Sequence, residues 1–291
     1  MTEIVQSCPL CGGEQFRLFD QRTFRGLAVT NRICGTCGLV YQSPRMTEAE
    51  LGVFYKIEYR RLYQGEQGPD AKDLAVQGRR AEALLAFCQG RLPAVKRHLD
   101  IGCSAGLLLQ RFRQAYSCRS TGVEPGAAYR DYAQGQGLKV YAGLDEVTVK
   151  KSTRFDLVSM AHVLEHLPYP VDYLVNLRQN LLRPAGWLLV EVPNLYAHDS
   201  FEVAHLVSYS IHTLRQVLGK AGFEIVALEQ HGRPRSRLLP LYVTALARPA
   251  EVPAPTQILP DGGVRFKRSW GMARRWLLER LLPRQAWLPI E

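Results

Sequence analysis

The chain has 291 residues, 46% of them apolar, which is enough for one large domain with a sizeable core and a smaller second unit. No apolar run reaches the length of a membrane span, and the first residues lack the basic-then-apolar order of a signal peptide, so we expect a cytoplasmic protein. The formal net charge of +10 is compatible with nucleic acid, an acidic substrate or an anionic membrane surface, and composition does not choose among them.

The first forty residues contain two knuckles of the form C-x-x-C-G, which lie about twenty residues apart. Cys8 and Cys11 form the first knuckle, Cys34 and Cys37 form the second, and the glycine after each pair allows the positive φ of a tight turn. Four thiolates with this spacing complete a tetrahedral zinc site without an open position, so the predicted zinc ion is structural. Two disulfides or four unrelated cysteines are the alternatives, and a repeated knuckle in a cytoplasmic chain disfavours both. We expect residues 1–43 to form a zinc ribbon.

Residues 44–94 have the character of a helical linker or cap. Thr47 followed by Glu50 is the pattern of a capping box, in which each side chain accepts a backbone N–H of the other residue at a helix start. A second helix is predicted over 70–88, because its apolar residues recur at helical spacing.

The stretch from 95 to 106 has the pattern of a strand, a small-residue turn and a helix. An apolar strand over 95–100 ends with Asp100, the turn over 102–106 reads G-x-S-x-G, and apolar residues over 107–115 recur at helical spacing. Such a turn lets a polar ligand approach backbone N–H groups. Glu124 closes the next apolar segment, at the distance where a doubly wound fold places a carboxylate against a ribose diol.

From residue 95 to about 250, predicted strands and helices alternate, which indicates an α/β fold with a mostly parallel sheet covered by helices on both faces. The seven predicted strands are 95–100, 120–124, 138–141, 155–160, 186–192, 223–228 and 239–247. The helices expected between them include 107–115, 127–134, 171–182 and 211–221.

In this order of motifs the chain resembles the class I S-adenosylmethionine-dependent methyltransferases. That family carries an acid-x-Gly-x-Gly-x-Gly turn and an acid after the second strand; here Ser104 takes the place of the middle glycine. Further segments similar to the family follow in the right order, at 155–158, 162–168, 182–187, 191–194 and 213–223. The resemblance implies a seven-stranded, doubly wound, Rossmann-like sheet over 95–250, whose last strand is antiparallel, and a transferase that binds S-adenosylmethionine.

The resemblance also implies roles for particular residues. Asp100, through water or the N–H groups of the turn, would anchor the methionine part, and Glu124 would accept the ribose hydroxyls. Adenine would lie near 142–144, and Tyr59 or Tyr63 would line the site from the segment before the domain. The residues implied to bind the cofactor are Asp100, Gly102, Cys103, Ser104, Gly106, Glu124, Pro125, Ala161 and His162.

Candidate residues for acceptor chemistry are histidines in the C-terminal half of the domain, where loops follow strand ends. A histidine that titrates near neutrality can take a proton from a hydroxyl or an activated carbon. His205 is the first candidate, because its segment resembles a Glu-His-Leu segment of zinc-ribbon sugar C-methyltransferases in which the histidine is a proposed base. Here Ala204 replaces that glutamate, which weakens the expectation of carbon methylation. His166 is the second candidate, with a structural role as its alternative.

The last forty residues are predicted to form a connector and a basic amphipathic helix, over 251–291. Tryptophan and leucine side chains share one side of the helix at 264–282, and from 264 to the end seven basic residues stand against two acidic ones. Such a helix is typical of one that lies on an anionic membrane, and packing against the main domain or a second subunit is the alternative.

The sequence as a whole predicts an S-adenosylmethionine-dependent methyltransferase with a structural zinc ion. Its acceptor is expected to be a small molecule or a glycan- or lipid-linked precursor, methylated on oxygen rather than on carbon. One alternative is an RNA methyltransferase that grips phosphates with its ribbon and basic tail, and another is a non-enzymatic zinc-ribbon interaction protein. Residues 160–163 read Met-Ala-His-Val, which lacks the Asn/Asp-Pro-Pro-aromatic element that recognises exocyclic amines of nucleic acids.

Overall fold

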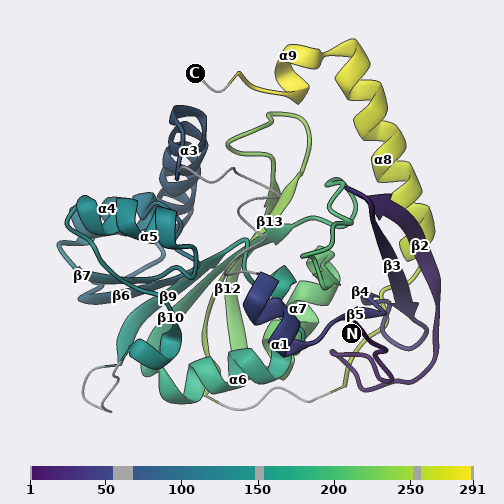
Figure 1. Ribbon diagram of the computed structural model, residues 1–291, viewed down its shortest axis with the longest axis horizontal. Coiled ribbons are helices and arrows are strands. Elements are labelled where there is room, and N and C mark those ends of the chain that lie inside the picture. The colour runs from purple at the N-terminus through teal and green to yellow at the C-terminus, as the bar shows by residue number, and fades with distance from the viewer. Residues whose placement is uncertain (1, 55–67, 148–153, 252–256, 290–291) are drawn as a thin grey trace.

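The computed structural model describes residues 2–54, 68–147, 154–251 and 257–289. Tyr59 and Tyr63, expected at the cofactor, lie outside these residues. The described part holds a seven-stranded sheet, a four-stranded sheet beside it and a long C-terminal helix that runs along the smaller sheet (Figure 1). None of the described helices is both long enough and apolar enough to cross a membrane.

The large sheet has the strand order β12-β13-β10-β9-β6-β7-β8. Strands β6 to β10 pair in parallel, whereas β13 runs antiparallel to both of its neighbours. All seven predicted strands, the parallel core and the single antiparallel strand are therefore confirmed. The strands are β6 (Arg97–Ile101), β7 (Arg119–Val123), β8 (Lys139–Tyr141), β9 (Phe155–Ala161), β10 (Leu182–Pro193), β12 (Phe223–His231) and β13 (Tyr242–Pro249).

Helices cover both faces of this sheet (Figure 1). Leu157 and Leu189 bury their side chains with the helices on one face, while their strand neighbours Val158 and Val190 join the core on the other. This division follows from the alternation of side chains along a strand. The first face is covered by α3 (Ala71–Cys88), α4 (Leu107–Tyr116) and α5 (Ala127–Gly135), and the second by α6 (Pro170–Asn180) and α7 (Ile211–Lys220).

The four-stranded sheet has the order β11-β4-β3-β2, and one of its strands comes from the large domain. Strand β11 (Val207–Ser208) follows the loop that carries His205 and pairs with β4 (Val40–Gln42), so that Val207 lies opposite Tyr41. The ribbon is thereby joined by backbone hydrogen bonds to the segment beside His205. The other strands of the N-terminal region are β2 (Phe16–Phe24) and β3 (Leu27–Cys34) of this sheet and the separate pair β1 (Thr2–Glu3) and β5 (Arg45–Met46).

The remaining elements are short, apart from α8 (Val264–Leu281) at the C-terminal end. The capping box predicted from Thr47 and Glu50 is present at the start of α1 (Glu48–Val53). The short helices are η2 (Leu144–Glu146), η4 (Leu164–His166) and α9 (Pro283–Ala286).

Candidate active site

The predicted glycine-rich turn lies at the C-terminal end of β6, where ligands bind in open parallel sheets. Gly102 and Gly106 have φ values of +73° and +81°, which only glycine adopts freely. Ser104, in place of the usual middle glycine, keeps the turn at a φ of +50°. The substitution that distinguishes this chain therefore leaves the backbone turn intact.

Glu124 ties the turn to the loop that follows β7. Its carboxylate accepts the N–H of Ser104 at 2.9 Å and the N–H of Gly126 at 2.8 Å. The guanidinium of Arg130 donates hydrogen bonds to the carbonyl oxygens of Glu124 and Pro125 and so fixes the same loop. A buried carboxylate thus joins the turn after β6 to the loop after β7.

Asp100 lies deeper than expected and does not contact the N–H groups of the turn. It is 3% exposed, and its Oδ1 accepts the hydroxyl of Ser159 at 2.5 Å, while that hydroxyl lies 2.7 Å from Nε2 of His98. Burial raises the pKa of Asp100 to about 7; the Ser159 hydroxyl opposes the rise and the nearby charge of Glu124 adds to it. Burial also lowers the pKa of His98 to about 3, so that histidine is neutral and offers Asp100 no compensating charge.

The raised pKa makes the stability of the protein depend on pH through Asp100. Between pH 4 and pH 7 the folded chain holds a proton that the unfolded chain releases, so stability falls as the pH rises. We expect Asp100→Asn to raise the melting temperature at pH 8 by roughly 5–10 °C, and not at pH 4, since three units of pKa correspond to about 4 kcal/mol. Thermal melts of wild type, Asp100→Asn and the exposed control Asp131→Asn check this, and equal gains at both pH values would contradict it.

Ala161 and His162 lie at the end of β9, the strand beside β6. His162 has a φ of +57°, and its imidazole stands between two buried carboxylates. Nδ1 lies 3.4 Å from Glu165 Oε1 and Nε2 lies 3.3 Å from Glu191 Oε1. His162 therefore lies directly after β9, with two acidic neighbours.

Glu191 is a centre of polar contacts that the sequence did not reveal. Its buried carboxylate lies 3.1 Å from Nε of Arg80, 3.3 Å from Nε2 of His231 and 3.0 Å from the hydroxyl of Thr244. These contacts, and the one to His162, outweigh the effect of burial and lower the pKa of Glu191 below its usual range. A glutamate inside the apolar run of β10 is the one signal that the sequence carried, because an unpaired charge is rarely buried.

His166 and His205, the two candidates for acceptor chemistry, lie next to each other. Their ring centroids are 4.8 Å apart, although 38 residues separate the segments that carry them. Nδ1 of His166 lies 2.9 Å from the carbonyl oxygen of Ala204, and Nδ1 of His205 lies 2.8 Å from that of Ser200. A carbonyl oxygen only accepts hydrogen bonds, so each Nδ1 carries the proton and each Nε2 keeps its lone pair.

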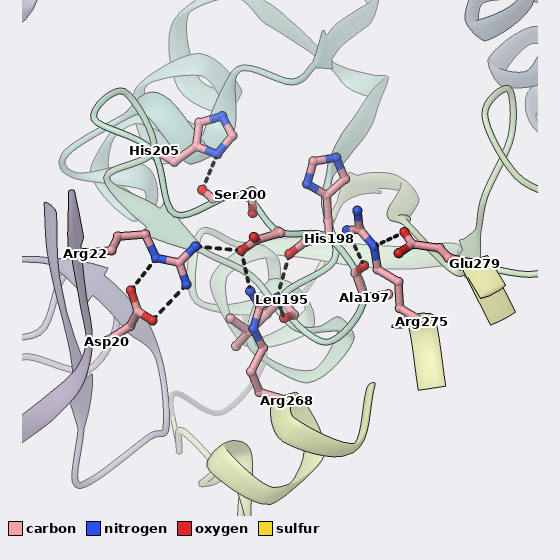
Figure 2. A network of polar contacts seen from close by, with 11 residues as sticks. Asp20, Arg22, Leu195, Ala197, His198, Ser200, His205, Arg268, Arg275 and Glu279 are labelled. Atoms are coloured by element: carbon pink, nitrogen blue, oxygen red, sulfur yellow. Dashed lines mark hydrogen bonds and ion pairs between the residues drawn. The ribbon is translucent and has the colours of Figure 1, made fainter. Parts of the chain in front are cut away.

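The loop that carries His198 and His205 is held from two directions (Figure 2). Arg268 of α8 is buried and donates to the carbonyl oxygens of Leu195 and His198. Asp199 of the same loop accepts from Arg268 and from Arg22 of the ribbon strand β2. The loop that carries His198 and His205, called the histidine loop below, is therefore fixed by contacts with both the C-terminal helix and the ribbon.

Gly271 and Arg275 of α8 make further contacts with the histidine loop. A Cβ at Gly271 would lie 1.8 Å from the carbonyl oxygen of Tyr196, so only glycine lets the helix approach the loop this closely. Arg275 donates to the carbonyl of Ala197 and pairs with Glu279 (Figure 2). The basic character of α8, taken from the sequence as a membrane feature, thus serves in part to position the histidine loop.

The four predicted metal ligands come together in the ribbon. Their sulfur atoms all lie within 4.8 Å of one another, with Cys8 to Cys37 at 3.6 Å and Cys11 to Cys34 at 3.5 Å. These distances match the separation of about 3.8 Å expected for thiolates 2.3 Å from a tetrahedral zinc ion. They exceed the S–S bond of about 2.05 Å, and all seven cysteines are free thiols. The residues present therefore fit a structural zinc ion.

Comparison with known proteins places the domain in a family. Residues 73–228, more than half of the chain, match the methyltransferase domain family. The chain is 31% identical over 100 residues to a ubiquinone biosynthesis O-methyltransferase of Nitrosococcus oceani, covering 32% of this chain and 42% of that protein. A protein of the same name from Marinobacter nauticus is 29% identical over 110 residues, covering 35% and 45%. The chain spans less than half the length of these relatives.

Solved structures show the same fold. A 1,6-didemethyltoxoflavin N1-methyltransferase from Burkholderia thailandensis, solved with S-adenosylhomocysteine, matches 80% of this chain and 100% of its own at 21% identity and a TM-score of 0.55. A mitomycin 7-O-methyltransferase matches 68% of this chain and 60% of its own at 18% identity and a TM-score of 0.51. The strand order, the turn after β6 and the family match agree: the chain belongs to the methyltransferase domain family, with the fold of the class I S-adenosylmethionine-dependent methyltransferases.

Proposed function

We propose that the chain transfers the methyl group of S-adenosylmethionine to a hydroxyl of a small molecule or of a glycan- or lipid-linked precursor. One observation carries the proposal: Asp100 and Glu124 stand at the ends of β6 and β7, His162 and His166 follow β9, and His205 lies in the loop after β10, so all of them lie at the carboxyl ends of neighbouring parallel strands. Methyl transfer is an in-line displacement, which needs the donor and the acceptor side by side.

The residues around the turn fit a sulfonium nucleoside with an amino-acid end. Glu124 is a buried carboxylate that offers oxygen atoms to a ribose diol, and Asp100 supplies a second carboxylate for a cationic group. The backbone of 102–106, together with Cys103, passes along the same edge, with Pro125 on the next loop and Ala161 and His162 on the far side. The bound cofactor would supply an electrophilic methyl group, and these residues would orient it.

In this proposal the acceptor would lie against the two imidazoles. Since Nδ1 of each ring is held by a carbonyl oxygen, Nε2 is the atom of His205 and of His166 that acts on the acceptor hydroxyl. Burial lowers the pKa of both histidines, that of His166 to about 4, so both rings are neutral at pH 7 and able to accept a proton. His205 is the residue that we assign to deprotonation, with His166 beside it.

Oxygen is favoured over carbon as the acceptor atom for two reasons. Ala204 removes the acidic neighbour that the resembling C-methyltransferases place before their histidine. The curated relatives, matched over part of their length, are named O-methyltransferases.

Incubation of the full chain with S-adenosylmethionine labelled in the methyl group, and with separate fractions of small metabolites, glycans, lipids and RNA, tests the proposal. We expect label in at least one of the first three fractions and not in RNA. Ribonuclease-sensitive label would favour the RNA alternative, and the binding of RNA to the protein should then weaken steeply with increasing salt concentration. Absence of S-adenosylhomocysteine binding in calorimetry would favour the non-enzymatic alternative.

We further propose that α8 rests on an anionic membrane surface, as suits a lipid-linked acceptor. Its apolar stripe faces solvent, with Phe266, Trp270 and Leu281 each about two-thirds exposed or more. Of the seven basic residues, Arg265, Lys267, Arg268 and Arg275 contact protein groups. The exposed cations that would meet lipid phosphates are Arg274, Arg280 and Arg284.

Co-sedimentation with anionic and neutral vesicles tests this surface. We expect wild type to bind anionic vesicles and the double variant Trp270→Ser, Leu281→Ser to bind them at least about five-fold less, because each buried apolar side chain contributes roughly 1.5–3 kcal/mol. Removal of the helix is a poor test, because it would also remove Arg268 from the histidine loop. Equal sedimentation of wild type and the variant would end the membrane proposal.

A further inference from the structure

Glu165, in η4, carries a buried carboxylate whose hydrogen bonds are not made. Its residue is 1% exposed, and neither carboxylate oxygen has a hydrogen-bond partner among the described residues. The side chain of His162 lies beside it, with Nδ1 at 3.4 Å from Oε1. A buried charge without hydrogen bonds is costly, and nearly all buried polar groups in folded proteins have partners. The geometry therefore indicates that a group outside the protein chain belongs beside Glu165.

The two histidines beside Glu165 each have one ring nitrogen fixed by the backbone. Nε2 of His166 and Nε2 of His205 belong to the rings whose Nδ1–H groups donate to the carbonyl oxygens of Ala204 and Ser200. This is the arrangement in which metal-binding histidines are held, since a backbone carbonyl on one nitrogen orients the other toward the ion. One ligand atom from each of Glu165, His166 and His205 lies within 4.8 Å of the other two.

We propose that Glu165, His166 and His205 bind a divalent first-row transition-metal ion. Two imidazoles and one carboxylate are a donor set that such ions prefer, in contrast to the four thiolates of the ribbon. Metal–ligand bonds of about 2.0–2.1 Å in a tetrahedral site put the ligand atoms roughly 3.3 Å apart. The ligand atoms of the three residues lie within 4.8 Å of one another, so they would need to approach by about 1.5 Å at most to bind the ion. Three protein ligands leave a position open, and His166 also lines a cavity of about 490 Å³ between α1 and α6.

The inference rests on the proposed function and changes what the two Nε2 atoms do there. The acceptor hydroxyl binds the open position, the ion lowers the pKa of that hydroxyl, and its proton passes to water. The oxygen then forms a bond to the methyl carbon of the sulfonium donor, and the carbon–sulfur bond breaks with its electron pair left on sulfur. His205 thus acts as a ligand that activates the acceptor through the ion, rather than by taking the proton itself.

A titration with Mn²⁺ tests the site in the full chain with zinc retained by the four cysteines. Mn²⁺ competes poorly for thiolates, so loss of the electron paramagnetic resonance signal of free Mn²⁺ reports the site of nitrogen and oxygen ligands. We expect one Mn²⁺ per chain, and a Kd raised at least about ten-fold in the isosteric variant Glu165→Gln and in His205→Ala. His212 is half-buried, and its Nε2 lies 2.8 Å from the carbonyl oxygen of Leu259; His212→Ala provides the matched control, which should bind Mn²⁺ as wild type does.

Absence of Mn²⁺ binding by wild type, or equal binding by Glu165→Gln, would overturn the metal site. Two further measurements separate this failure from failure of the proposed function. If S-adenosylhomocysteine does not bind in calorimetry, the proposed function fails whatever Mn²⁺ does. If His205→Ala lowers kcat at unchanged cofactor affinity while wild type binds no Mn²⁺, the proposed function stands with His205 as a free base, and the metal site is overturned.

Discussion

Glu124→Ala should weaken the binding of S-adenosylhomocysteine by about 100-fold or more, because hydrogen bonds to a charged group contribute roughly 1.5–3 kcal/mol each and a ribose diol makes two. The carboxylate already receives two backbone N–H groups, from Ser104 and Gly126. The variant therefore loses both the ribose contact and part of the support of the turn. Isothermal titration calorimetry at a temperature where circular dichroism shows the variant folded measures the effect.

Two companion variants separate these contributions. Glu124→Gln keeps the side-chain volume and one acceptor oxygen, so it should lose less affinity than Glu124→Ala. Glu224→Ala removes an exposed acid on β12, at the opposite edge of the sheet, where its ion pair with Arg248 is worth little. Its affinity should match that of wild type. If the affinity of Glu124→Ala for S-adenosylhomocysteine were unchanged, the ribose would have to bind elsewhere on the protein.

Cys37→Ser should release the zinc ion and lower the melting temperature by more than about 10 °C, since a structural zinc site contributes folding free energy directly. Cys37 is 1% exposed and lies in the same core cluster as Leu206 and Val207 of the large domain. Loss of the ribbon therefore opens a core that both parts share. Zinc content by atomic emission and thermal melts measure the change, and Cys118→Ser, a buried cysteine outside the four, provides the control.

The same variant should separate turnover from cofactor binding. Strand β11 pairs with β4 of the ribbon and follows His205 directly, and the N–H of Gln42 donates to the carbonyl of Leu206. A disordered ribbon would displace His205 but leave the turn at Asp100 in place. We expect kcat to fall at least about ten-fold while the affinity for S-adenosylhomocysteine changes by less than about three-fold. Intact turnover in a zinc-free chain would contradict this coupling.

Local patterns in the sequence determined most of the fold. Seven strands and the helices between them follow from apolar periodicity and turn residues, because these act between near neighbours along the chain. The spacing of the four cysteines was enough to predict that they come together. Such features are written within short stretches, so they can be read without coordinates.

Tertiary structure alone decided how distant segments meet. His166 and His205 lie next to each other in the folded chain, and Glu165 and Glu191 lie on either side of the His162 ring. Arg268, on a helix expected to lie on a membrane, instead donates to a carbonyl oxygen of the histidine loop. Apart from His162 and Glu165, which are three residues apart, these contacts join residues tens of positions apart, so no local periodicity encodes them. The sequence also does not show which side chains are buried. A helix that lies on a membrane and a helix that buries an arginine against carbonyl oxygens have the same pattern of charges along the sequence, and only the packing in the folded chain distinguishes them.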